Sequence, residues 1–140
     1  MAYLLDTNVL SELRRGAKCN SNVRAWAKSV ANQPCYVSVL SLGEIRKGIE
    51  ILRRRSPSQV TAFEDWLERL TTDFDDKILP ISQEIADNWG HLNASRSNPV
   101  IDSLLAATAV QFRLTIATRN VSDFPKEILV VNPWELNAMA

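Results

Sequence analysis

The side chains of this chain that could carry chemistry are carboxylates, and the first of them follows a short apolar strand. Tyr3–Leu5 is predicted as that strand; Asp6 stands at its exit, and Thr7 and Asn8 are residue types that cap helices. Open α/β sheets bind ligands at the carboxyl ends of their strands, so an acid in this position suits a site. On this stretch alone a simpler interpretation stays open, in which Asp6 only caps the next helix.

Four further polar positions fall at comparable places. Glu44 is predicted in the first turn of the helix after the second strand, and Asp102 in the first turn of a later helix. Asn120 follows the fourth predicted strand, and Asp123 stands three residues further on. Because parallel strands end at the same edge of a sheet, Asp6, Glu44 and Asn120 should gather there. Asp102 joins them if its helix begins at that edge.

Carboxylates that are brought together repel one another. At about 5 Å and an effective dielectric constant near 20, each pair costs roughly 3 kcal/mol. A fold keeps such a cluster if a cation neutralises it or if one acid stays protonated. The single histidine, His91, is expected at the core edge or the surface, so the ligands would be oxygens, which favour Mg²⁺ or Mn²⁺ over Zn²⁺. Such a site suits phosphodiester hydrolysis by metal-activated water.

Apolar periodicity predicts the elements that must position these acids. Further strands are expected at 35–38, 78–81, 114–118 and 129–131. Helices are expected from about 9 to 16, from 21 to 31, after a capping box formed by Ser41 and Glu44, at 58–72, at 82–95, and after Asn98 and Pro99. Strands separated by helices require crossovers, hence an α/β fold with a parallel sheet covered on both faces. The whole chain, 1–140, is predicted as one domain.

Composition narrows the class of protein. Sixteen acidic and sixteen basic residues give zero net charge, so no global field indicates a nucleic-acid binder. Two cysteines, Cys19 and Cys35, are expected to be free thiols in a reducing compartment. Neither a signal peptide nor an apolar run near the roughly 18 residues of a membrane span is present, so we expect a cytoplasmic protein. There is no glycine-rich phosphate loop, and no Ser–His or Cys–His pair for covalent catalysis.

Four segments, in order, resemble the motifs of PIN-domain toxins, the VapC-like ribonucleases of bacterial type II toxin–antitoxin systems. They are Leu5–Asn8, Ser41–Ile45, Ile101–Ala109 and Thr118–Phe124, and the closing Val131–Trp134 is similar to the FitB-like branch. The resemblance spans nearly the whole chain. It implies a three-layer α/β/α sandwich around a short parallel sheet of four to five strands. It also implies a Mg²⁺-dependent endoribonuclease in which Mn²⁺ can substitute.

The resemblance also implies roles for individual residues. It places Asp6, Glu44 and Asp102 as catalytic acids and metal ligands. In the family the fourth position is often Asp; here it is Asn120, and Asp123 could supply the missing charge, so the choice between the two stays open. Two hydroxyls are expected to orient the carboxylates, although for the first a plain helix-cap role is an alternative: Thr7 and Thr118.

Partners follow from the same resemblance. The implied partners are an RNA substrate, a cognate antitoxin of the VapB-like or FitA-like kind, operator DNA only through that antitoxin, and a second copy in a homodimer. No membrane partner is expected. Phosphate contacts are predicted for Arg119, Arg46 and Lys47. The dimer prediction also rests on Ile51 and Trp66, large apolar residues that lie off the inward stripes of their helices.

Two other functions are compatible with parts of the sequence. Haloacid-dehalogenase-like phosphotransferases also begin with a strand and an Asp, but they use a second Asp two residues on, where this chain has Asn8. Alternatively, the chain is a subunit of a DNA-binding toxin–antitoxin repressor with weak or no nuclease activity. RNA cleavage by the purified chain with and without Mg²⁺ separates these functions best.

Overall fold

The computed structural model describes residues 1–135, and five short parallel strands form its single sheet. In the order β3-β2-β1-β4-β5, these are Ile78–Leu79, Cys35–Ser38, Tyr3–Leu5, Thr115–Ala117 and Val130–Val131. The predicted parallel sheet is therefore confirmed. The later strands are shorter than predicted by one or two residues at their ends.

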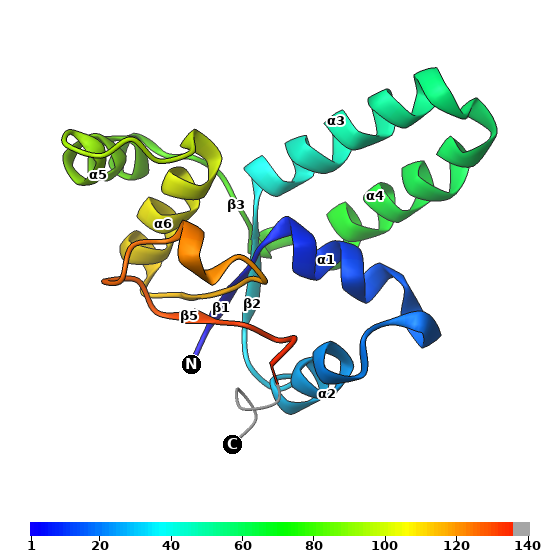
Figure 1. The fold of residues 1–140 in the computed structure, drawn as a ribbon, viewed down its shortest axis with the longest axis horizontal. Helices are drawn as coiled ribbons and strands as arrows, with labels where there is room; N and C mark the ends of the chain where they lie inside the picture. The colour runs from blue at the N-terminus through cyan, green and yellow to red at the C-terminus, as the bar shows by residue number, and fades with distance from the viewer. Residues whose placement is uncertain (136–140) are drawn as a thin grey trace.

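Within residues 1–135, six α-helices connect the strands. They are α1 (Thr7–Arg14), α2 (Ser21–Ser29), α3 (Val39–Arg55), α4 (Val60–Phe74), α5 (Gln83–Asn93) and α6 (Val100–Phe112). Short 3-10 turns lie at Gly16–Lys18, Pro57–Gln59, Asp75–Lys77 and Val121–Asp123. Figure 1 shows α5 and α6 together on one side of the molecule and α1 to α4 on the other. This is the three-layer arrangement that the resemblance implied.

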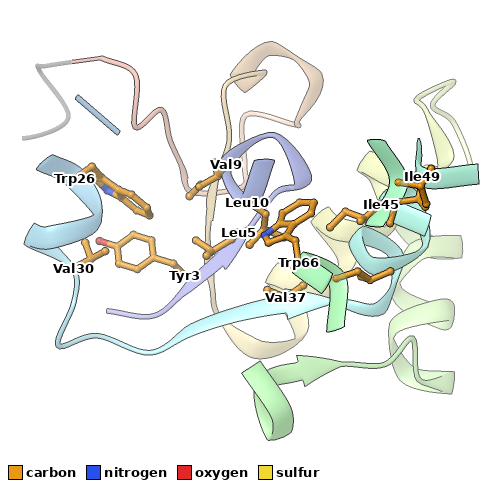
Figure 2. Packing of buried hydrophobic residues seen from close by; sticks show 13 residues of the cluster. Tyr3, Leu5, Val9, Leu10, Trp26, Val30, Val37, Ile45, Ile49 and Trp66 are labelled. Atoms are coloured by element: carbon orange, nitrogen blue, oxygen red, sulfur yellow. The ribbon is translucent and has the colours of Figure 1, made fainter. Parts of the chain in front are cut away.

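The central strand β1 is buried on both faces. Its successive side chains point to opposite sides of the sheet. Tyr3 and Leu5 pack on the side of α1 to α4, where the Tyr3 and Trp26 rings meet edge-on with centroids 5.3 Å apart (Figure 2). Leu4 packs on the other side against Leu105 of α6. The end of β1 is therefore held firmly between two cores.

The order of the strands places a topological switch beside β1. The chain adds β2 and then β3 on one side of β1, and α5 and α6 return it to β4 on the other side. Leu5, the last residue of β1, pairs with Ala117, the last residue of β4, so the two strands end level. Open α/β sheets bind ligands at such switch points. Asp6 and Thr118 are the first residues beyond the two strand ends.

Two predicted helix starts are wrong. The N-cap of α3 is Ser38, whose hydroxyl accepts a hydrogen bond from the backbone N–H of Leu40. Ser41 lies inside the helix, and its buried hydroxyl has no partner within residues 1–135. Glu44 therefore lies in the second turn of α3, not the first. Similarly, α6 has Pro99 as its N-cap residue and begins one residue later than predicted, with Asp102 still in its first turn.

The predicted exposure of Trp66 is also wrong. Trp66 is 8% exposed and belongs to the core cluster in Figure 2, where its ring meets Phe63 edge-on. The guanidinium of Arg14 lies 3.8 Å from the centroid of the Phe63 ring, so α4 packs closely on α1. Ile51 is 47% exposed, so the dimer stays a prediction that rests on this residue and on the family resemblance.

Three simpler expectations concern the cysteines, the histidine and the membrane. Cys19 and Cys35 are both free, as predicted. Burial raises the pKa of both thiols. His91 is exposed at the surface of α5, beside Asp87. None of the helices within residues 1–135 has the length and apolar character that a membrane crossing requires.

Candidate active site

Asp6 is a nearly buried carboxylate at the end of the central strand, with 6% of the residue exposed. Its Oδ1 accepts a hydrogen bond of 2.7 Å from the backbone N–H of Thr7, which caps α1. The other oxygen, Oδ2, accepts a hydrogen bond of 2.8 Å from the hydroxyl of Thr118. Asp6 therefore does cap α1, as the simpler interpretation held. That interpretation is incomplete, because Thr118, the residue after β4, also fixes the Asp6 side chain.

The hydroxyl of Thr118 makes three hydrogen bonds. It donates to Asp6 and accepts from the side-chain amide of Asn8 at 3.3 Å and from the backbone N–H of Asn120 at 3.0 Å. The backbone N–H of Arg119 donates to Asn8 Oδ1 at 3.2 Å. These contacts bind the exit of β4 to the first turn of α1. The role of Asn8 was not predicted, since its type indicated only a helix cap.

Glu44 reaches the same edge of the sheet from α3. Its Oε1 accepts a hydrogen bond of 2.6 Å from the hydroxyl of Thr7. Thr7 therefore contacts two acids, Asp6 through its backbone and Glu44 through its side chain. The plain helix-cap alternative for Thr7 is wrong, because Asp6 is the N-cap of α1 and Thr7 is its first residue.

Asp102 faces the other acids from the first turn of α6. Its pKa is raised to about 6. Burial is the largest cause, followed by the negative charges of Asp6, Asp123 and Glu44. These charges act on Asp102, so Asp6, Glu44, Asp102 and Asp123 lie near one another at the switch point, outside the carboxyl ends of β1 and β4. Open α/β sheets have their binding crevice at this point, and the place is called the crevice below.

The acids do not form a finished ligand cage. Within residues 1–135 no three acidic, histidine or cysteine side chains lie close enough together to hold a metal ion as they stand. Asn120 and Asp123 are both exposed, and the backbone N–H of Asp123 donates to the carbonyl of Asn120 across a 3-10 turn. The donor set is nevertheless all oxygen and mutually repelling, which fits a hard divalent cation.

The predicted phosphate-binding residues differ in the contacts that their side chains make with the rest of the protein. Arg46 is held between two acids, with hydrogen bonds of 2.6 and 3.0 Å to Glu64 of α4 and one of 3.1 Å to Glu50. Lys47 is exposed. The guanidinium of Arg119 lies 5.2 Å from the centroid of the Trp134 ring. That stacking was not predicted, although Trp134 closes the last motif of the sequence.

The comparisons with known proteins identify the family. The family model of the PIN domain matches residues 3–126. This chain belongs to the PIN-domain family. It is similar to Toxin FitB of Neisseria gonorrhoeae, with 32% identity over 137 residues that cover 94% of this chain and 97% of FitB. It is also similar to VapC ribonuclease Y4jK of Sinorhizobium fredii, with 32% identity over 142 residues, 94% of this chain and 97% of that protein.

Solved structures share the fold. FitAcB from Neisseria gonorrhoeae superposes with a TM-score of 0.78 at 32% identity, covering 96% of this PIN domain and 99% of that chain. A toxin–antitoxin complex from Klebsiella pneumoniae superposes with a TM-score of 0.62 at 26% identity, covering 95% and 98%.

Replacing Thr118 by Val tests how far the site depends on one hydroxyl. Thr118→Val keeps the shape of the side chain but leaves Asp6 Oδ2 without its donor. We expect a loss of unfolding free energy of about 1–3 kcal/mol, measured by urea denaturation. The matched control is Thr115→Val, a buried residue of the adjoining strand β4 whose hydroxyl makes no side-chain hydrogen bond within residues 1–135. Equal losses in the two variants would show that the hydroxyl bond is unimportant.

The raised pKa of Asp102 predicts a pH-dependent stability without metal. Below about pH 4 the carboxyl is protonated in both the folded and the unfolded chain, so it has no effect. Between about pH 4 and 6 only the unfolded chain releases the proton, so stability falls and then stays lower. In EDTA, the melting temperature of Asp102→Asn minus that of wild type should therefore grow from near zero at pH 4 to a few degrees above pH 6. A difference that is the same at every pH would contradict this.

Proposed function

We propose that this PIN-domain protein is the toxin of a type II toxin–antitoxin system, a Mg²⁺-dependent endoribonuclease that a cognate antitoxin neutralises. The observation that carries the proposal is the nearness of the buried Asp6 to Asp102, whose pKa is raised first by burial and then by the neighbouring acids. A divalent cation would relieve that repulsion. The names of two relatives, one a toxin and one a VapC ribonuclease, support the same activity.

The proposed metal ligands differ in the hydrogen bonds that hold them. Asp6, Glu44 and Asp102 would hold Mg²⁺ or Mn²⁺, with Asn120 or Asp123 completing the shell. When bound, the cation would supply a nucleophile from water and neutralise charge on the phosphate. Asp6 is fixed by one hydrogen bond on each oxygen, so its orientation is set before binding. Thr7 donates to Glu44 Oε1, and within residues 1–135 Oε2 makes no hydrogen bond that would compete with a cation.

RNA would be held by cations beside this acidic crevice. Lys47 and Arg119 are the stronger candidates, because Arg46 is paired with Glu64 and Glu50. The chain has no net charge, so affinity for the backbone should be modest and should fall with salt. The alternative of a repressor subunit without nuclease activity is not favoured, since DNA binding alone needs no cluster of carboxylates.

An apolar hollow beside the acids suits the antitoxin. A cavity of about 340 Å³ lies between α1, α3 and α4 and includes Thr7 and Glu44 at its polar end. Its other lining residues are Ser11, Ile45, Gly48, Ile49, Leu52, Phe63 and Trp66. We place the C-terminal segment of the antitoxin across this hollow, with one basic side chain beside the acids. Operator DNA would be contacted only through the antitoxin, and the toxin is proposed as a homodimer.

Neutralising each acid tests the proposed reaction. Asp6→Asn, Glu44→Gln and Asp102→Asn should each lower Mg²⁺-dependent RNA cleavage about 100-fold or more while the fold persists. Cleavage is followed on labelled RNA with Mg²⁺ and with EDTA, and circular dichroism checks the fold. The control is Asp87→Asn, an exposed acid of α5, which should cleave like wild type. Full activity in Asp102→Asn would contradict the assignment of Asp102 as a catalytic metal ligand.

A second comparison decides the fourth ligand. The charge of Asp123 acts on Asp102, whereas Asn120 contributes no charge. Asp123→Ala should therefore weaken Mn²⁺ binding more than Asn120→Ala, as measured by isothermal titration. An unchanged affinity in Asp123→Ala would leave Asp123 as a turn residue only.

The proposed inhibition predicts competition between antitoxin and metal. A basic side chain among the acids and a cation would exclude each other, because both need the same carboxylates. Raising the Mg²⁺ concentration should restore RNA cleavage by the purified complex several-fold. Inhibition that does not change with Mg²⁺ would point to a purely steric block.

A further inference from the structure

The first turn of α6, which carries Asp102, has no side-chain cap. Pro99 occupies the N-cap position and has no side-chain oxygen to accept the free N–H groups of the helix start. The carboxyl of Asp102 also faces the negative charges of Asp6, Asp123 and Glu44. A missing cap and like-charge repulsion both favour fraying of this turn away from the crevice, whereas the helix dipole favours the Asp102 carboxylate at this helix start.

One hydrogen bond from the neighbouring helix opposes that tendency. The indole N–H of Trp89 in α5 donates to the hydroxyl oxygen of Ser103 at 2.9 Å. The Ser103 hydroxyl in turn donates to the backbone carbonyl of Val100 at 2.9 Å. Ser103 is 5% exposed and Trp89 is half-buried, so water competes little for the bond. The two bonds fix the backbone on both sides of Asp102.

We propose that Trp89 is a positioning residue of the site, which anchors the first turn of α6 through Ser103 and so keeps Asp102 at the crevice. An indole N–H can only donate, and the Ser103 oxygen accepts while its own proton goes to Val100, so the chain of bonds runs in one direction. The inference rests on the proposed metal site, in which Asp102 is a ligand. Groups that orient metal ligands change metal affinity without touching the ion.

The test is Trp89→Phe, which keeps an aromatic ring and removes the donor. The Mn²⁺ affinity of the RNA-free protein should fall about five- to tenfold by isothermal titration. Amide exchange without metal should accelerate at Ser103, whose N–H bonds to the Pro99 carbonyl. The matched control is Asn88→Leu, which removes a 2.8 Å hydrogen bond to Gln111 between the same two helices, far from Asp102. It should leave Mn²⁺ affinity within about twofold of wild type.

Two further variants distinguish failure of the Trp89 inference from failure of the proposed metal site. Ser103→Ala removes the acceptor of the Trp89 bond together with the bond to Val100, so adding Trp89→Phe to it should weaken Mn²⁺ binding no further. Wild-type affinity in Trp89→Phe, or an equal loss in Asn88→Leu, would overturn the inference. Asp102→Asn serves as the reference: if it binds Mn²⁺ normally, the proposed metal site itself fails. Amide exchange at Ser103 then still decides whether Trp89 holds the turn.

Discussion

The hydrogen bond from Thr118 to Asp6 is the interaction on which the site depends. It joins the ends of two neighbouring strands, β1 and β4, that are far apart in the chain and meet only after three crossovers. A carboxylate with 6% exposure needs hydrogen bonds to replace the water that it loses on burial. The same Thr118 hydroxyl also accepts hydrogen bonds from the side-chain amide of Asn8 and the backbone N–H of Asn120. One group therefore sets the geometry of the switch point. The site therefore forms only when the sheet is complete.

Around this fixed centre, the remaining acids arrive on separate elements and are held less tightly. Glu44 comes from α3 and is bound by one hydroxyl, while Asp102 comes from α6 and meets repulsion. Because the pKa of Asp102 is raised in the folded protein, its ionisation lowers the free energy of unfolding at neutral pH when no cation is bound. A divalent ion would reverse that loss, so metal binding and stability should be linked. The arrangement is typical of a site that trades stability for function.

Local sequence signals predicted part of this structure, and packing decided the rest. Asp6 could be placed because the apolar run before it and the helix start after it are both local. The predicted start of α3 is wrong because Ser38 and Ser41 both suit an N-cap, and Glu44, three residues after Ser41, favoured the second. In the structure Ser38, the last residue of β2, caps α3 directly. The burial of Trp66 depends on how α4 packs on α1, with Arg14 covering Phe63, and no single-helix pattern contains that contact.

The most direct test of the account is a crystal structure of the protein grown with Mn²⁺ and measured at a wavelength where manganese scatters anomalously. The account predicts an anomalous peak in the crevice, with carboxylate oxygens of Asp6 and Asp102 within about 2.4 Å. Movement of these side chains toward the ion is expected, since the metal-free acids stand apart. Manganese bound only elsewhere, for example at Asp75 and Asp76, with the crevice unchanged, would contradict it.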